Sequence, residues 1–147
     1  MISTEENKAI VRRYYEEVLN QRLLTSIDAL FTPHFISHPA GEGYDASVDL
    51  QTYVQAIVRS HTAFPDLHVK IEAQIAEADL VATRWKAHGT QCGMLGNLPP
   101  TGKEITVTAM HFHRLADGKI VEHWEQFDLM GMLQQLGALP GGKDLKV

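Results

Sequence analysis

Hydrophobic positions recur at helical spacing through the first third of the chain. Ser3-Thr4-Glu5-Glu6 has the spacing of a capping box, and a helix is expected from there to about Gln21. One stripe of this helix is apolar and consists of Ile10, Val11, Tyr14, Tyr15, Val18 and Leu19. A short helix is expected at residues 26–31, ended by Thr32-Pro33, and a short extended piece at 35–38.

A third helix is predicted after the Pro- and Gly-containing loop at residues 39–43. Ser47 is its expected N-cap. One face of this helix carries apolar side chains and a histidine, namely Leu50, Tyr53, Val54, Ile57, Val58 and His61. This face is expected to pack against the rest of the molecule, because a surface helix buries its apolar stripe.

After residue 66, the spacing of hydrophobic residues changes from that of a helix to every second residue. Apolar and polar residues alternate between residues 67 and 75, as in a strand with one buried face. Further strands are predicted at 80–90, 104–115 and 119–127. Ala116-Asp117-Gly118 separates the last two and predicts a hairpin, taken here with a three-residue loop.

Helices that precede an antiparallel meander indicate an α+β fold, with the helices packed on one face of a curved sheet. A sheet covered in this way leaves a conical cavity, which is a usual place for a small-molecule site. A last short helix at 129–136 is expected to end at Gly137, and the tail after Pro140 to be loose. The 147 residues are expected to form one domain with its core at about 5–140.

Composition narrows the class of protein. A net charge of −5 and a pI near 5.9 argue against a nucleic-acid binder, which needs a basic surface. No apolar run reaches the roughly 18 residues of a membrane span, and the N-terminus lacks the features of a signal peptide. The single Cys92 excludes an internal disulfide. A cytoplasmic protein is the expectation.

The predicted hairpin groups several polar residues on one face. If Leu115 faces Lys119, His111 lies opposite His123, and Ala109 lies opposite Glu125. The odd-numbered face then holds Val107, Ala109, His111, His113, Val121, His123, Glu125 and Phe127. The even-numbered face holds Thr106, Thr108, Met110, Phe112, Ile120, Glu122, Trp124 and Asp128. Alternation does not say which face meets the helices.

His111, His123 and Glu125 are the candidate catalytic residues. A carboxyl group in an apolar pocket has a raised pKa, and a neighbouring imidazole can hold or relay its proton, which suits general acid–base catalysis. The alternative is a polar ladder on the surface, in which Glu125 pairs with a histidine. A second alternative is a metal site that uses His111, His113, His123 and Glu125, because side chains two apart on a strand share a face.

Weaker candidates could contact a ligand in the cavity. These substrate-binding candidates are His38, Asp128, Tyr14, Tyr53 and Trp85, although the aromatic residues and His61 are also ordinary core or cavity-rim residues. The sequence contains no Gly-rich phosphate loop and no GxSxG nucleophile motif. Cys92 has no base beside it in the sequence, which argues against a nucleophile.

Several segments resemble the SnoaL-like polyketide cyclases, also called ester cyclases. The similar segments are Val11–Asn20, Leu98–Lys103, Phe112-His113-Arg114, Asp117–Trp124, Asp128 and Leu133–Gly137. The likeness extends from about Glu5 to Pro140. It implies the cone-shaped α+β barrel shared with nuclear transport factor two, scytalone dehydratase and ketosteroid isomerase.

The resemblance also implies a chemistry. Members of the family close a ring of an aromatic polyketide methyl ester by an intramolecular aldol reaction, without a cofactor, and an acidic side chain serves as general acid–base. The family's aspartate after a His-Trp pair falls on Glu125, and its histidine on the preceding strand falls on His111. Glutamate in place of aspartate moves the carboxyl group by about a bond length, and errors near 1 Å can cost ~10²-fold in rate.

The expected function is therefore a cofactor-independent cyclase that acts on a small apolar or aromatic carbonyl compound. Two alternatives remain open, because one fold hosts many functions. The first is a non-catalytic small-molecule carrier or sensor that uses the same pocket, and the second is a hydrolase or dehydratase. A homodimer or a higher homo-oligomer is expected, since the outer face of the sheet carries many aromatic and β-branched residues.

Overall fold

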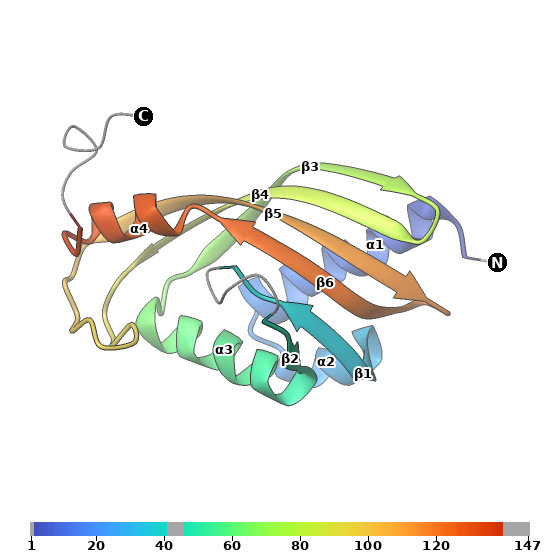
Figure 1. The fold of residues 1–147 in the computed structure, drawn as a ribbon, viewed down its shortest axis with the longest axis horizontal. Helices are drawn as coiled ribbons and strands as arrows, with labels where there is room; N and C mark the ends of the chain where they lie inside the picture. Colours follow the sequence, from blue (N-terminus) through green and yellow to red (C-terminus); the bar gives the residue numbers. More distant parts are fainter. Residues whose placement is uncertain (1, 41–45, 140–147) are drawn as a thin grey trace.

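The computed structural model describes residues 2–40 and 46–139. Its strands are β1 (Phe31–His38), β2 (Val48–Asp49), β3 (His68–Glu77), β4 (Leu80–Thr90), β5 (Glu104–Ala116) and β6 (Lys119–Phe127). They form one curved sheet in the order β2-β1-β6-β5-β4-β3 (Figure 1). β1 runs parallel to β6, and the other neighbouring strands are antiparallel.

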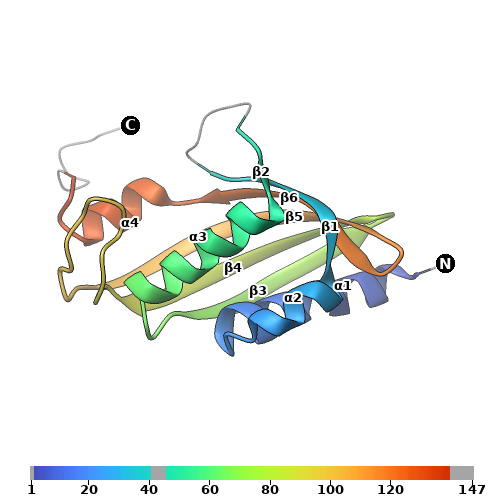
Figure 2. The same ribbon diagram turned by 90° about the horizontal axis from the view of Figure 1, so that it is seen from below.

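The helices cover one face of this sheet. They are α1 (Thr4–Arg13), the π-helix η1 (Tyr14–Asn20), the 3₁₀ turn η2 (Leu24–Ser26), α2 (Ile27–Leu30), α3 (Leu50–Ala63) and α4 (Leu129–Gln135). Figure 2 shows α3 across the same face of the sheet that α1 and α2 cover, while α4 lies at one end. This arrangement confirms the α+β fold with helices packed over a curved sheet.

The first helix begins as its sequence predicts. The Ser3 hydroxyl accepts from the Glu6 amide at 3.1 Å, and the Glu6 carboxylate accepts from the Ser3 amide at 2.7 Å. After Arg13 the helix continues to Asn20 with the wider π-helical turn, which periodicity did not predict. Such π-helical turns are rare and are frequently found at functional sites.

The starts of β1 and α3 differ from the sequence prediction. β1 begins at Phe31 rather than at residue 35, although its pairing with β6 is irregular around Pro33, which has no amide hydrogen to donate. The third helix is capped by Asp49 and not by Ser47. The Asp49 carboxylate accepts from the Thr52 amide at 2.9 Å, so the helix begins two residues later than expected.

β3 and β6 each contain a β-bulge that interrupts the regular alternation. The bulge between Ile71 and Ala73 turns Ile75 to the outside, where it is 73% exposed, although alternation placed it with the buried residues. In β6, Leu115 pairs with Ile120 and Arg114 with Glu122, so Val121 is the extra residue. Ile120 is consequently buried opposite Leu115, and it does not share the face of Glu122 and Trp124 with which alternation grouped it.

The hairpin between β5 and β6 has a tighter turn than predicted. Ala116 pairs with Lys119, and Asp117 and Gly118 both have positive φ angles, 51° and 78°, as a two-residue type I′ turn requires. The tighter turn and the bulge together shift the register. His111 therefore lies opposite Glu125, and the predicted pairs of His111 with His123 and of Ala109 with Glu125 are wrong.

The core lies between the helices and the sheet and contains many aromatic side chains. Its largest fully buried apolar members are Tyr14, Tyr15, Phe31, Phe35, Leu30 and Ile120. Gly137 ends the last helix with a φ of 77°, as its position predicted. The predicted loose tail lies outside the described residues. No helix in the described ranges is long and apolar enough to cross a membrane.

Candidate functional site

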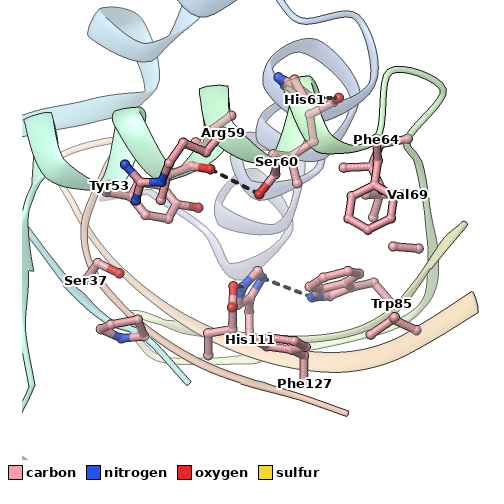
Figure 3. Close-up of a pocket in the computed structure, with 18 of the residues that line it drawn as sticks. Ser37, Tyr53, Arg59, Ser60, His61, Phe64, Val69, Trp85, His111 and Phe127 are labelled. Carbon is pink, nitrogen blue, oxygen red and sulfur yellow. Dashed lines mark hydrogen bonds and ion pairs between the residues drawn. The ribbon is translucent and has the colours of Figure 1, made fainter. Parts of the chain in front are cut away.

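A cavity of about 430 Å³ lies between α3 and the face of the sheet that the helices cover (Figure 3). Its walls are mainly apolar. β5 and β6 contribute Ile105, Val107, His111, His123, Glu125 and Phe127 to the lining. These residues all belong to the odd-numbered set, so the odd-numbered face of the hairpin is the inner one. The alternation alone had left this question open.

Glu125 and His111 form the central polar contact of the cavity. The His111 Nε2 atom lies 2.6 Å from the Glu125 Oε2 atom. The His111 side chain is 1% exposed and the Glu125 side chain 23%, so the imidazole is embedded in the protein while the carboxyl group reaches the open space. A carboxylate in this position can exchange a proton with a bound ligand.

The ring of His111 is held from its other side as well. The indole Nε1 of Trp85 on β4 lies 3.1 Å from His111 Nδ1, and the hydroxyl of Tyr15 lies 2.6 Å from the same atom. An indole N–H only donates, so Nδ1 is an acceptor here. The hydrogen of the neutral ring is then on Nε2, and His111 donates to the Glu125 carboxylate.

Two further histidines, His113 and His123, lie beside His111 in the protein interior. The His123 Nε2 atom shares a hydrogen bond with the Ser37 hydroxyl at 2.7 Å, and both nitrogens of His113 lack a partner within the described residues. Burial lowers the pKa of His113 and His123 well below 6.5, and the neighbouring His111 adds to the effect. Both rings are therefore neutral at pH 7.

Two tyrosines enter the same region from the helices. The Tyr14 hydroxyl on η1 is hydrogen bonded to the Tyr53 hydroxyl on α3, and both residues line the cavity. Burial raises the pKa of each phenol well above 10.0, so both hydroxyls keep their hydrogen at physiological pH. Tyr14, Tyr53 and Trp85 therefore lie where ligand contacts were expected.

His38 and Asp128, which the sequence suggested as ligand contacts, are not among the residues that line this cavity. His38 stacks on Trp124 with ring centroids 5.1 Å apart, and its Nε2 atom bonds to the Glu122 carboxylate at 2.7 Å. In β1 it is Ser37, one residue earlier, that points inward. The Asp128 side chain caps α4 by accepting from the Gly131 amide at 2.9 Å.

The cavity has polar lining residues that the sequence did not indicate. They include Ser37 on β1 and Arg59 and Ser60 on α3. Extending the alternation of β1 would have placed Ser37 beside the buried Phe35. Arg59 and Ser60 lie outside the apolar stripe of their helix and gave no such signal. The Ser60 hydroxyl donates to the Ala56 carbonyl at 3.0 Å.

His61, which lies on the apolar stripe of α3, is among the residues that line the cavity. Its Nε2 atom donates to the Leu19 carbonyl at 2.9 Å, and burial lowers its pKa. In the described ranges, no group of three or more His, Cys, Asp or Glu side chains has the geometry to hold a metal ion. The alternative of a metal site on the hairpin histidines therefore has no geometric support.

Over residues 9–136 the sequence matches the model of the family described as SnoaL-like polyketide cyclase. The chain belongs to this family. Among relatives, it is 28% identical over 105 residues to the nogalonic acid methyl ester cyclase of Streptomyces nogalater. That alignment covers 71% of this chain and 75% of the relative.

Solved structures of similar proteins share the whole fold. AclR from Streptomyces galilaeus, described as a candidate hydroxylase, superposes with a TM-score of 0.84 at 29% identity and covers 94% of this chain and 85% of its own. IdmH from Streptomyces antibioticus, described as a candidate polyketide cyclase, has a TM-score of 0.78 at 31% identity and covers 89% and 98%. These two relatives thus differ in the activity ascribed to them.

Proposed function

We propose that this SnoaL-like protein is an acid–base enzyme that acts on an apolar or aromatic carbonyl compound, with Glu125 as the group that transfers the proton. The main support is the position of Glu125, whose carboxyl group is held at 2.6 Å by buried His111 and reaches a largely apolar cavity. One carboxylate oxygen accepts from His111, and the other is available to a ligand. Positioned carboxylates of this kind contribute about 10²–10⁴-fold to proton transfer.

In the proposed reaction, Glu125 removes a proton from a carbon next to a carbonyl group, and the C–H electron pair moves into an enolate. The enolate carbon attacks a second carbonyl carbon of the same molecule and forms a C–C bond. The resulting alkoxide takes the proton back from Glu125. The product is an isomer of the substrate, so the step consumes no oxidant, reductant or cofactor. An intramolecular aldol reaction of this type is what membership of the family suggests.

The apolar lining favours a ligand with little charge. Leu67, Val69, Ala87 and Phe127 form part of the wall around the polar contact. An apolar wall binds the hydrocarbon part of a ligand by removing its surface from water. A polyketide-like aromatic ester with a side-chain carbonyl meets this requirement and is the substrate class that we propose.

Hydrogen exchange at a carbon next to a carbonyl tests the proposal. The ketone 1-tetralone is incubated in deuterated water with the protein, and loss of its α-hydrogens is followed by proton NMR. Exchange is expected with wild type and about 10²–10⁴-fold slower with Glu125→Gln. Glu104→Gln, which alters an exposed carboxyl group at the start of β5, is the matched control and is expected to behave as wild type.

Binding is measured in parallel by isothermal titration calorimetry. Retained binding with lost exchange in Glu125→Gln supports the enzyme. If 1-tetralone binds to wild type but does not exchange, the acid–base proposal fails and a carrier or sensor is favoured. Ring closure itself is examined with an aromatic methyl ester whose side chain carries an aldehyde. The aldol product has the same mass as its substrate but a different chromatographic retention time.

We also propose that the outer face of the sheet joins two copies of the chain. Ile75, Met110 and Phe112 are more than half exposed there, and Trp124 is 37% exposed. Apolar side chains gathered in this way on a sheet are typical of protein–protein contacts. The oligomeric state, measured by light scattering after gel filtration, tests this proposal.

A further inference from the structure

The imidazole of His111 is contacted from three separate elements. Trp85 on β4 and Tyr15 on η1 reach Nδ1, at 3.1 and 2.6 Å, while Glu125 on β6 reaches Nε2 at 2.6 Å. The contact between Trp85 and His111 is visible along the floor of the cavity in Figure 3. The sequence suggested Trp85 only as a ligand contact or a core residue. Its indole nitrogen is instead directed at the histidine.

The chemistry of these contacts restricts which ring nitrogens of His111 can carry hydrogen. An indole N–H cannot accept a hydrogen bond, so a hydrogen on Nδ1 would face the hydrogen of Trp85. The imidazolium form needs hydrogens on both ring nitrogens. It would therefore lose the Trp85 contact inside a buried site, where an unpaired donor is costly.

We propose that Trp85 is a positioning residue that keeps hydrogen off Nδ1 of His111, so that the hydrogen of the ring is on Nε2. In this form His111 donates one fixed hydrogen bond to Glu125 and takes up no proton itself. The inference rests on the proposed acid–base role of Glu125. It adds that the carboxylate works alone as the proton carrier, with Trp85 acting on it through His111.

The titratable groups around His111 favour Glu125 as the last group that accepts the proton. The other titratable groups that face the ring are Tyr14, Tyr15, His113 and His123. Burial keeps both tyrosines protonated and both histidines neutral. A proton taken from a ligand by the Oε1 atom of Glu125 thus has no acceptor behind His111, and it returns from the same carboxyl group to the reaction intermediate.

Nitrogen NMR of the ligand-free protein tests the inference directly. Protein labelled with ¹⁵N in its histidines reports which ring nitrogen carries hydrogen, and His111 is assigned by comparison with His111→Gln. In wild type at pH 7, Nδ1 is expected without hydrogen and Nε2 with it. A wild-type signal with hydrogen on Nδ1, in either the neutral or the doubly protonated ring, overturns the proposal without any further variant.

Two variants remove the contacts to Nδ1 one at a time. In Trp85→Phe the indole donor is lost, and hydrogen on Nδ1 of His111 is expected to appear. Exchange of 1-tetralone is expected to fall about tenfold, less than the 10²–10⁴-fold loss without the base itself. Trp124→Phe is the control. It replaces the chain's other tryptophan, which lies on the outer face, and is expected to leave the His111 signals unchanged.

If Trp85→Phe fails to fold, the nitrogen signals of His111 are measured in Tyr15→Phe. It is expected to leave the His111 tautomer as in wild type, because the indole donor is still in place. If Trp85→Phe folds and its His111 signals match wild type, Trp85 does not hold the tautomer and the inference is wrong. Failure of the proposed acid–base function can be distinguished from failure of this inference. In that case the wild-type protein would not catalyse hydrogen exchange of 1-tetralone, whatever its nitrogen signals show.

Discussion

His113 on β5 lies directly opposite His123 on β6, and their ring centroids are 5.2 Å apart in a part of the core that water does not reach. Of their four ring nitrogens, only Nε2 of His123 has a hydrogen-bond partner within the described residues. Two neutral imidazoles thus occupy the position between the aromatic core and the cavity. A buried ionisable pair of this kind makes stability depend on pH.

We predict that the protein loses stability as the pH falls below 6.5. Burial lowers the pKa of both histidines in the folded state, so below 6.5 the unfolded chain binds protons that the folded chain does not. The stabilisation is complete above the unfolded pKa and decreases towards the lowered folded one. Each histidine contributes about 1.4 kcal/mol per pH unit in that interval.

Urea unfolding at pH 7.5 and 5.5 measures this effect. The two histidines together are expected to reduce the free energy of unfolding by about 2–3 kcal/mol between these pH values. His113→Phe removes one of the two groups and should show about half of the histidine contribution. An unchanged pH dependence in that variant would contradict the prediction.

We predict that the length of the side chain at position 125 is matched to this cavity. Glu125→Asp retains a carboxylate but withdraws it by about a bond length from His111 and from the ligand. Displacements near 1 Å cost ~10²-fold in rate, so exchange of 1-tetralone should fall by about that factor while its binding is retained. An exchange rate equal to or above that of wild type would mean that the longer side chain has no role in positioning.

Gln91 is predicted to organise the loop between β4 and β5. Its buried side-chain amide donates to the carbonyls of Gly93, Leu98 and Pro99 at 3.1–3.3 Å, and its Oε1 atom accepts from the Thr101 hydroxyl at 2.7 Å. Gln91→Ala should cost on the order of 3 kcal/mol, because several buried polar groups lose their partner.

Urea unfolding compares this loop variant with a matched control. Gln126→Ala removes an exposed glutamine of β6 and is expected to change stability by less than about 0.5 kcal/mol. Hydrogen–deuterium exchange should localise the effect of Gln91→Ala to residues 91–103. Equal stability of the two variants would show that the buried amide does not hold the loop.

Self-association through the outer face is predicted to depend on Phe112. Phe112→Glu places a charge in the middle of the exposed apolar group and should shift the protein towards monomer in light scattering after gel filtration. Val58→Glu introduces the same charge at an exposed apolar position on α3 and serves as the control. If both variants keep the mass of wild type, the outer face is not the contact, and a monomeric wild type would refute the dimer itself.

Local patterns predicted most elements of the fold because short-range chemistry determines them. The capping box at Ser3, the period-two strands and the positive φ at Gly137 each depend on a few neighbouring residues. The strands β4 and β6 have the bounds that alternation predicted. The grouping of His111, His123 and Glu125 on one face also follows from alternation, which is local to each strand.

The sequence alone determined the class of fold, the family and the small set of polar residues on the odd-numbered face. Only the tertiary structure decided that this face is the inner one and that Glu125 lies opposite His111, because bulges and the two-residue turn set the register. It also turned His38 outward and brought Trp85 and Tyr15 onto the His111 ring. These contacts join residues far apart in the chain. Strand pairing brings His38 to Trp124 and Trp85 to His111, and packing of η1 on the sheet brings Tyr15 to the same ring.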